Sequence, residues 1–330
     1  MSKLKVTMAC SPYDRFQPLL DGTVQVDGVD LNFIPMEVEE TFWRQFRHAE
    51  FHVAELSFSS FVMQKSKGDN RFVAIPVFSS RFFRHSCVYI NAHKGIKTPQ
   101  DLKGKLVGVP EYQMTAPLWL RGIFQHYYNV CPHEIRWRAG GIYEPARTEK
   151  LPVSLPDNID YQPIPNNRTL SDMLESGELD ALFTARTPGS FLKGSPNVKR
   201  LFENYAEEEA KFFKDTGIFP IMHVLGILRE TYEQHPWLAM SLYKACLQAK
   251  RKAEENLTNA SALYTMLPWQ VYELERTRKL MGEDWWPYGF HENRKVIEAI
   301  CRYSFEQGLS KRLVEPEELF AKETFDMYKI

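Results

Sequence analysis

The run FPIMHVLGIL, residues 219–228, is the segment on which the expected fold depends. It contains no Asp, Glu, Lys or Arg, and its only ionisable side chain is His223. A short apolar run of this kind is typical of a strand that is buried on both faces. Mainly helical sequence follows it, so we interpret residues 219–228 as a strand that returns to the first part of the chain.

Strands and helices alternate before this run. We expect strands at residues 5–10, 30–35, 51–56, 72–77, 85–91, 105–110 and 179–184, with helices between most of them. Such alternation predicts mainly parallel sheets with right-handed crossovers. Together with the returning strand, this alternation predicts a two-lobed α/β protein with a ligand cleft between the lobes. Residues 1–92 and 219–330 would form the first lobe with its C-terminal helices, and residues 93–218 the second.

Composition restricts the kinds of partner that the chain can have. The 330 residues are 44% hydrophobic and 25% charged, and the formal net charge is −1. This balance gives no electrostatic field suited to nucleic acid or to a membrane surface. The five cysteines are dispersed and form no C-x-x-C motif, which argues against disulfides and a cysteine zinc site. With no apolar leader or run of 18 apolar residues, we expect a soluble, cytoplasmic protein.

Candidate ligand-binding residues follow the predicted strands, because open sheets of this type bind ligands at the carboxyl ends of their strands. Ser57 and Thr115 each stand where a helix is expected to begin, and free backbone N–H groups at such a point attract a carboxylate or phosphate. Taken singly, a Ser or Thr at such a point is more often a structural cap, so the argument depends on several such signals together. Arginines near strand ends add possible bidentate carboxylate contacts: Arg15, Arg81, Arg84 and Arg186. Together these features predict an anionic small ligand, plausibly with two carboxylates.

Two histidines are candidates for acid–base chemistry. His223 lies within the apolar run and is either a satisfied core residue or a partly buried imidazole at the junction of the lobes. His85 begins an expected strand in an arginine-rich segment. A metal held by His85, His223 and Glu111 is a third interpretation, although no H-x-x-x-H or H-E-x-x-H spacing supports it. No P-loop, G-x-G-x-x-G or G-x-S-x-G motif occurs.

Five segments in order along the chain resemble the 4,5-dihydroxyphthalate decarboxylase family. They are AELSFSSFVM (residues 54–63), SSRFFRHSCVYIN (79–91), EYQMTAPLWLRGIF (111–124), LFTAR (182–186) and WWPYG (285–289). The resemblance extends over nearly the whole chain. It implies a type 2 periplasmic-binding-protein fold that has become an enzyme in the cytoplasm.

The resemblance also implies non-oxidative loss of one carboxylate from 4,5-dihydroxyphthalate, giving protocatechuate (3,4-dihydroxybenzoate) and carbon dioxide. The hydroxyl para to the departing carboxylate would assist protonation of the ring. We expect no organic cofactor, with a divalent metal on the catechol oxygens as an alternative, and we expect a homo-oligomer. The competing hypotheses are a solute-binding protein for a small anion and an enzyme of the same fold that acts on another small acid.

That chemistry assigns roles to the candidate residues. The proton donor would be His223 or His85, and the base at the hydroxyls would be Glu55 or Glu111. The substrate-binding candidates are Arg15, Ser57, Arg81, Gln113, Thr115 and Arg186.

Overall fold

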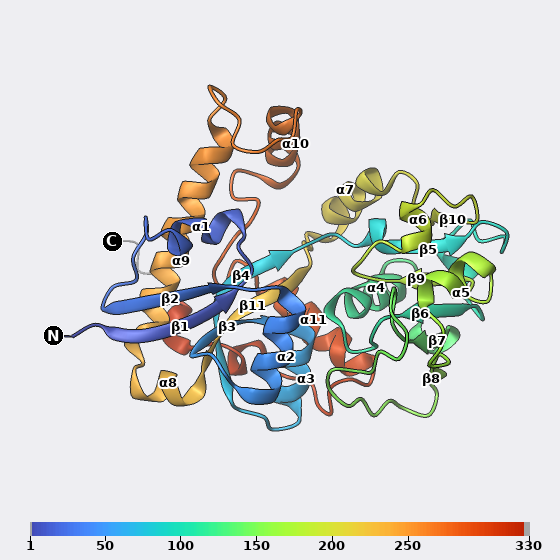
Figure 1. Ribbon diagram of the computed structural model, residues 1–330, viewed down its shortest axis with the longest axis horizontal. Coiled ribbons are helices and arrows are strands. Elements are labelled where there is room, and N and C mark those ends of the chain that lie inside the picture. Colours follow the sequence, from blue (N-terminus) through green and yellow to red (C-terminus); the bar gives the residue numbers. More distant parts are fainter. Residues whose placement is uncertain (1, 327–330) are drawn as a thin grey trace.

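Two separate β-sheets organise the chain, one in each lobe, as Figure 1 shows for the computed structural model, which describes residues 2–326. The first sheet has the order β2-β1-β3-β11-β4, and its strands are β1 (Leu4–Cys10), β2 (Val29–Pro35), β3 (Val53–Ser57), β4 (Phe72–Arg81) and β11 (Ile221–Leu228). The second has the order β10-β5-β9-β6-β7-β8, and its strands are β5 (Val88–Asn91), β6 (Leu106–Val109), β7 (Arg136–Ala139), β8 (Tyr161–Pro163), β9 (Ala181–Phe183) and β10 (Val198–Arg200). The predicted two-lobed α/β architecture is confirmed.

The returning strand β11 lies between β3 and β4 in the first sheet. Its apolar side chains are almost all buried, which explains why the run contains so little polar sequence. Gly226 is required by this packing, because a Cβ atom there would stand 2.3 Å from the side chain of Leu56. The register pairs His223 with Ser57 on one side and with Ser80 on the other. The single polar residue of the run therefore lies beside the last residue of β3.

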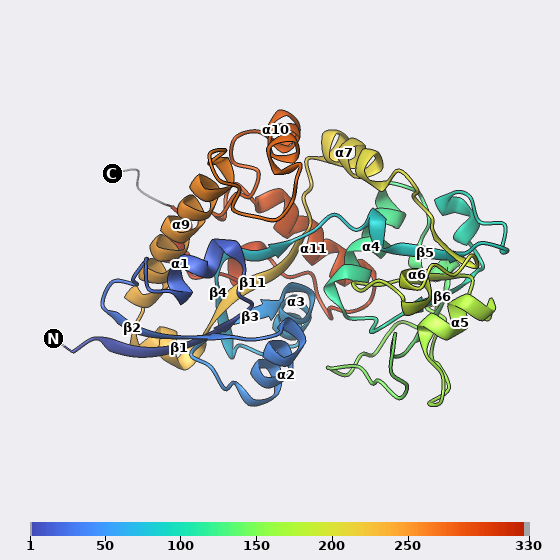
Figure 2. The same ribbon diagram turned by 45° about the horizontal axis from the view of Figure 1, so that its top comes forward.

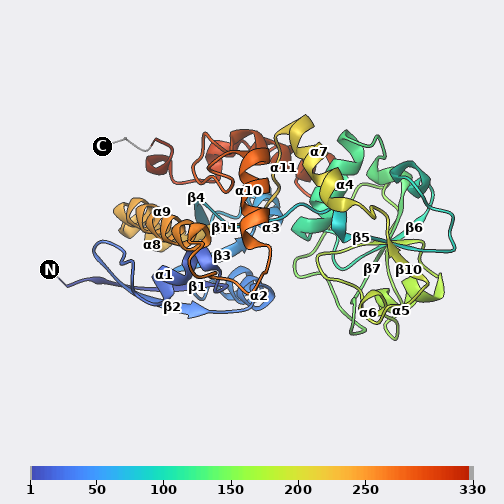
Figure 3. The ribbon, with the colours of Figure 1, turned by 90° about the horizontal axis from the view of Figure 1, so that it is seen from above.

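Two strands run opposite to the others in their sheets, whereas the sequence predicts mainly parallel strands. These are β5 and β11, which form antiparallel pairs with all their neighbours. Both follow a crossing between the lobes, visible in Figure 3. A chain that leaves one sheet at the cleft enters the other sheet from the cleft. The incoming strand therefore runs away from the cleft, opposite to its neighbours, which run towards the cleft. Because β5 belongs to the second sheet, the first crossing comes before residue 88, earlier than the expected boundary at residue 92.

Helices flank both sheets. Those that follow strands of the first sheet, together with the C-terminal helices, are α1 (Gln17–Leu20), α2 (Val38–His48), α3 (Phe58–Ser66), α8 (Arg229–Gln234), α9 (Trp237–Thr258), α10 (Gln270–Met281) and α11 (Arg294–Glu306). Those of the second segment are α4 (Thr115–His126), α5 (Leu170–Ser176), α6 (Gly189–Leu192) and α7 (Tyr205–Thr216). Short 3-10 turns occupy Asp14–Phe16, His85–Cys87, Pro99–Leu102, Pro132–Glu134, Pro316–Glu318 and Lys322–Thr324.

The helices expected from the sequence form where the apolar spacing places them. In α9, Leu242, Cys246, Ala249 and Ala253 are buried along one face, as predicted. Helix α5 ends at Gly177, whose φ of 79° is the left-handed conformation that glycine adopts without strain. No helix among residues 2–326 is long and apolar enough to span a membrane.

Helix α4 connects the two lobes, and α11 fixes its position. A Cβ atom at Gly122 of α4 would stand 2.0 Å from the ring of Tyr303 of α11, so the two helices approach closely. The buried Arg121 donates to Gln307 at 2.7 Å, and Trp119 donates to the carbonyl oxygen of Ile221 at 2.8 Å. Because α4 is held against both α11 and β11, the beginning of this helix has a defined position relative to the first sheet.

Candidate active site between the lobes

Two adjoining cavities lie between the lobes. The inner cavity, of about 180 Å³, is lined from the first lobe by α2, the end of β3 and the start of β11, and from the second lobe by the beginning of α4 and the loops near residues 150 and 185. The outer cavity, of about 460 Å³, is lined mainly by residues 141–147 and 185–186. Glu39, Met114, Ala185 and Arg186 line both. A cavity of about 150 Å³ can hold benzene, so the inner cavity has room for one aromatic ring.

His223 reaches the inner cavity in a hydrogen-bonded pair with Glu55. Its Nδ1 lies 2.7 Å from Oε1 of Glu55, and its side chain is only 15% exposed. The ring of Phe42 packs edge-on against the imidazole, with the ring centroids 4.8 Å apart. Within residues 2–326, Nε2 of His223 has no hydrogen-bond partner. Of the two nitrogens, Nε2 is therefore the one available to a ligand.

Glu55 is fully buried and surrounded by donors. The hydroxyls of Tyr13 and Ser79 donate to Oε1 at 2.8 and 2.9 Å, and the backbone N–H of Ser11 donates to Oε2 at 3.2 Å. Burial raises the pKa of this carboxyl, but the charge and hydrogen bond of His223 and the other donors outweigh burial and hold the pKa below its ordinary value. An ionised Glu55 accepts the Nδ1 hydrogen bond of His223 and so orients the imidazole.

The beginnings of α3 and α4 meet at the inner cavity. The hydroxyl of Thr115 lies 3.0 Å from that of Ser57 and 2.9 Å from that of Ser59. The N-cap of α4 is Met114, which has no capping side chain, so Thr115 is the first helical residue and not the cap. In the described part of the chain, the backbone N–H groups of Thr115 and Ala116 have no partner. Both residues line the cavity, and two free N–H groups at a positive helix end suit a carboxylate.

Arg84 supplies a buried positive charge at the same cavity. Its guanidinium donates only to sulfur atoms, to Met222 at 3.2 Å and to Cys87 at 3.7 Å. No carboxylate of residues 2–326 lies within 4 Å of it. Burial lowers the pKa of Arg84, because the charged form has lost its water. A buried cation without an anionic partner is costly, which indicates that an anionic ligand supplies the missing charge.

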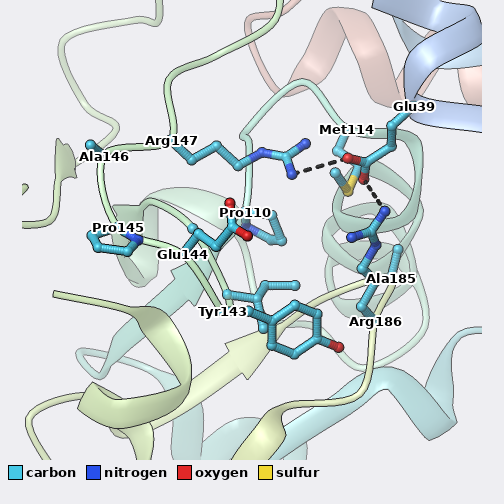
Figure 4. Close-up of a pocket in the computed structure, with 12 residues that line it drawn as sticks. Glu39, Pro110, Met114, Tyr143, Glu144, Pro145, Ala146, Arg147, Ala185 and Arg186 are labelled. Atoms are coloured by element: carbon cyan, nitrogen blue, oxygen red, sulfur yellow. Dashed lines mark hydrogen bonds and ion pairs between the residues drawn. The ribbon is translucent and has the colours of Figure 1, made fainter.

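A carboxylate from the first lobe bridges two arginines of the second, as Figure 4 shows. Glu39 of α2 lies 3.1 Å from Arg147 and 3.4 Å from Arg186. Arg147 is also bound by Glu111, whereas Glu39 is the only carboxylate within 4 Å of Arg186 among the described residues. The side chain of Arg186 is 46% exposed. Because Arg186 lines both cavities, its guanidinium is available to a ligand in either of them.

Glu111 and Gln113 lie behind the cavity wall and line neither cavity. Glu111 accepts from Arg147 at 2.5 Å and lies 3.7 Å from Nζ of Lys150. Gln113 joins Glu111 to the hydroxyl of Ser60. Lys150 does line the inner cavity. Glu111 thus forms ion pairs with Arg147 and Lys150, and these contacts hold the two side chains in place.

Arg15 and Arg81, both expected to bind substrate, do not line either cavity. Arg15 donates through Nε to the carbonyl oxygen of Ser79 at 2.9 Å and stacks on Trp286. Arg81 is buried and donates to the carbonyl oxygens of Phe219 and Pro287 and to Asn293. These contacts satisfy backbone carbonyls, so both arginines have a structural role in this arrangement.

His85 is also away from the cavity. Its ring lies among Tyr128, Phe202 and Phe212, and neither ring nitrogen has a hydrogen-bond partner among the described residues. Burial lowers the pKa of His85 from 6.5 to about 4. The three residues of the metal hypothesis, His85, His223 and Glu111, thus occupy separate environments. No group of three potential metal-binding His, Cys, Asp or Glu side chains occurs within residues 2–326.

We expect His85 to make the protein sensitive to acid. Its pKa is lower in the folded state than in the unfolded chain, so stability is complete above pH 6.5 and falls as the pH drops from 6.5 towards 4. At about 1.4 kcal/mol per pH unit, the loss approaches about 3 kcal/mol. In His85→Phe, the difference in unfolding free energy between pH 7.5 and pH 4.5 should shrink by about 2–3 kcal/mol, measured by urea denaturation. An equal loss in both proteins would contradict this account.

Sequence reasoning did not assign site roles to several residues that line the cavities. Lys150 and Arg147 lie in an irregular segment without a motif, and Glu39 is one of several acids at the start of a helix. Only their positions in the folded chain distinguish them. Arg84 did carry a signal, since it lies among the strand-end arginines, but the same signal selected Arg81.

Two curated proteins of the same name are similar to this chain over much of its length. The chain is 42% identical over 330 residues to 4,5-dihydroxyphthalate decarboxylase of Comamonas testosteroni, with full coverage of both proteins. It is 43% identical over 204 residues to the enzyme of the same name from Pseudomonas putida, which covers 62% of this chain and 79% of that one. The predicted resemblance to this family is confirmed. No protein-family model matches the chain.

The fold is similar to that of a solute-binding protein. The periplasmic aliphatic sulphonate-binding protein SsuA of Escherichia coli superposes with a TM-score of 0.54 at 12% identity, covering 98% of this chain and 99% of its own. This confirms the expected periplasmic-binding-protein-like fold, and at such low identity it concerns the fold alone. The full-length identity to a decarboxylase decides the family. The chain belongs to the 4,5-dihydroxyphthalate decarboxylase family and is a carboxy-lyase.

Proposed function

We propose that this enzyme removes one carboxylate from 4,5-dihydroxyphthalate without oxidation and gives protocatechuate and carbon dioxide. The observation that supports this most directly is the inner cavity, where the His223–Glu55 pair, the unpaired Arg84 and the free N–H groups of α4 come together. The cavity has room for one ring. Its lining has three cations, Arg84, Lys150 and Arg186, against the single carboxylate of Glu39. This excess of positive charge favours a substrate with more than one carboxylate.

The carboxylates of the substrate have two natural seats in this proposal. One is formed by Arg84, which has no anionic partner of its own among the described residues. The other is the beginning of α4, where the N–H groups of Thr115 and Ala116 are free. Lys150 would face the hydroxyls, where its charge stabilises a developing phenolate. The role expected for Glu55 as a direct base is replaced by an indirect one through His223, because Glu55 does not line the cavity.

Protonated His223 is the proposed acid. Its Nε2 proton is transferred to the ring carbon that bears the departing carboxylate, while the para hydroxyl releases its proton to solvent water and becomes a ring carbonyl. The bond to the carboxylate then breaks, its electron pair restores the aromatic ring, and carbon dioxide leaves. The ring oxygen regains a proton, so the reaction consumes one proton overall. Direct expulsion of carbon dioxide would leave an aryl anion, and this route avoids it.

One assay tests the reaction and the source of the new ring proton. The purified protein is incubated with 4,5-dihydroxyphthalate in D₂O, and protocatechuate and carbon dioxide are measured together. We expect equal amounts of both, with one deuterium at the vacated ring position. Saturable binding without carbon dioxide would contradict the proposed reaction, and no binding would favour an enzyme for another small acid. A product without deuterium at that position would contradict proton donation by an exchangeable group.

Cofactor independence and a cytoplasmic location are parts of the same proposal. The hydroxyl para to the departing carboxylate accepts the electrons that other decarboxylases pass to a cofactor, so the scheme needs no further group. Turnover should therefore survive dialysis against a chelator. Loss of activity that is restored by a divalent metal ion would contradict this point without affecting the choice of substrate.

We expect Arg186 to act in substrate binding more than in chemistry. Because it is half-exposed and only weakly paired with Glu39, Arg186→Ala should raise KM about 3–10-fold and change kcat by less than about 3-fold. Glu39→Gln should lower KM, because it removes a carboxylate that competes with the substrate for the same guanidinium. Steady-state kinetics of both variants and of the double variant test the coupling. An unchanged KM in both single variants would place Arg186 outside the site.

A further inference from the structure

Residues 259–281, here called the arm, carry an unusual number of exposed apolar side chains. Met266 is 100% exposed, Trp269 72% and Tyr272 61%, and four other large apolar side chains of the arm are also exposed: Leu263, Tyr264, Leu267 and Val271. Figure 1 shows that the end of α9 and helix α10 project beyond the rest of the first lobe, and Figure 2 shows the same from another direction. A concentrated apolar patch on a soluble domain marks an interaction surface.

The arm has no role at the cavities and little support from its own chain. None of its residues lines the inner or the outer cavity. Helix α10 packs mainly against α9, and Gln270 is its only fully buried residue. An isolated helix of 12 residues is only marginally stable in water. A contact with another molecule would therefore both cover the apolar side chains and hold the helix.

The charges of α10 indicate which molecule this is. Its outward face carries Val271, Tyr272, Glu275 and Lys279, all exposed and at helical spacing. Within residues 2–326, neither Glu275 nor Lys279 has an ion-pair partner. If a second α10 lies antiparallel on this face, Glu275 of each copy meets Lys279 of the other, and both unpaired charges are satisfied at once. The face is thus complementary to itself, which is the requirement of a two-fold contact.

We propose that the arm is a homodimer interface, in which α10 of one copy packs antiparallel on α10 of a second copy. The two Glu275–Lys279 pairs lie next to the two-fold axis and fix the orientation, and Trp269 and Tyr272 of each copy supply apolar contacts on either side of them. A parallel arrangement would instead bring like charges together. This inference does not depend on the proposed substrate, because the arm and the cavities share no residue.

The first test measures mass in solution. Light scattering coupled to size-exclusion chromatography should show wild-type protein as a dimer, or as a multiple of a dimer, at micromolar concentration. Trp269→Ser with Tyr272→Ser should weaken self-association at the arm by about 30-fold or more while turnover per chain stays within about 2-fold. Trp43→Ser, which removes another exposed tryptophan, is the matched control and should leave the mass unchanged. A monomeric wild type, or a double variant of unchanged mass, would overturn the proposal.

The second test exchanges the charges. Glu275→Lys and Lys279→Glu should each weaken the dimer, because each variant brings like charges together across the two-fold axis. The double variant carrying both changes should recover most of the affinity, since it restores two opposite-charge pairs. These are exposed positions, so folding should be unaffected, as checked by circular dichroism. If the losses of dimer affinity in the two single variants add up in the double variant, the antiparallel arrangement is overturned.

Discussion

His223→Asn should lower kcat about 10²–10⁴-fold while KM changes by less than about 3-fold. The reason is that Asn can still hydrogen-bond to Glu55 but cannot deliver a proton to the ring, so the variant keeps the shape of the site and loses its acid. The range is what one positioned acid contributes. Stopped assays for protocatechuate give kcat, and titration with substrate under conditions too slow for turnover gives affinity.

Two controls separate a chemical role of His223 from a structural one. His85→Phe replaces the other buried histidine, which does not line the cavity, and should leave kcat nearly unchanged. Glu55→Gln keeps the size of the side chain but removes the carboxylate that orients the imidazole, so it should lower kcat less than His223→Asn does. If His223→Asn retains wild-type turnover while His85→Phe loses it, the assignment of the proton donor is reversed.

Arg84→Met should raise KM about 100-fold and at the same time stabilise the substrate-free protein. In the wild type, the buried guanidinium is hydrogen-bonded only to sulfur atoms and the Glu209 carboxylate acts on it only from beyond 4 Å, so its charge is incompletely compensated in the free enzyme. A charged hydrogen bond to a substrate carboxylate that is removed in a buried site costs about 3 kcal/mol, which corresponds to about 100-fold in binding. Replacing the guanidinium by an apolar chain removes the desolvation cost and should raise the melting temperature by several degrees.

Arg81→Met is the matched control, because Arg81 is another buried arginine with no carboxylate within 4 Å in the described structure. It differs in donating to two backbone carbonyls and to Asn293. Its loss leaves buried acceptors unpaired, so this variant should melt at a lower temperature. Opposite shifts in melting temperature for the two variants would support a ligand site at Arg84. A destabilised Arg84→Met with unchanged KM would refute it.

Much of the fold follows from local patterns. The alternation of strands and helices and the apolar run 219–228 predicted two lobes and the return of the chain, because burial on both faces of a strand leaves a readable sequence. The antiparallel direction of β5 could not be read in the same way. An apolar strand has the same pattern in either direction, and its direction depends on the side from which the chain enters the sheet.

The site was predictable in part for a related reason. The strand-end rule selected Ser57, Thr115, Arg186 and His223, and all four line the inner cavity. The rule does not say where a long side chain points. Arg81 and Arg84 are three residues apart, yet one turns to backbone carbonyls and the other to the cavity. Lys150 and Glu39 reach the site from separate elements, and no local spacing records that approach.

The position of β11 in the first sheet also sets the order in which the enzyme can be assembled during synthesis. The second sheet has all its strands once residue 200 has left the ribosome. The first sheet lacks β11, the last of its strands to be synthesised, until residue 228 has left the ribosome. About 170 residues separate the end of β3 from the end of β11, which takes on the order of 10–30 s at about 5–20 residues per second. Until then, Glu55 has no His223 beside it. The edges of β3 and β4 that pair with β11 therefore have no partner until this strand is made, and the candidate site is complete only when β11 is in place.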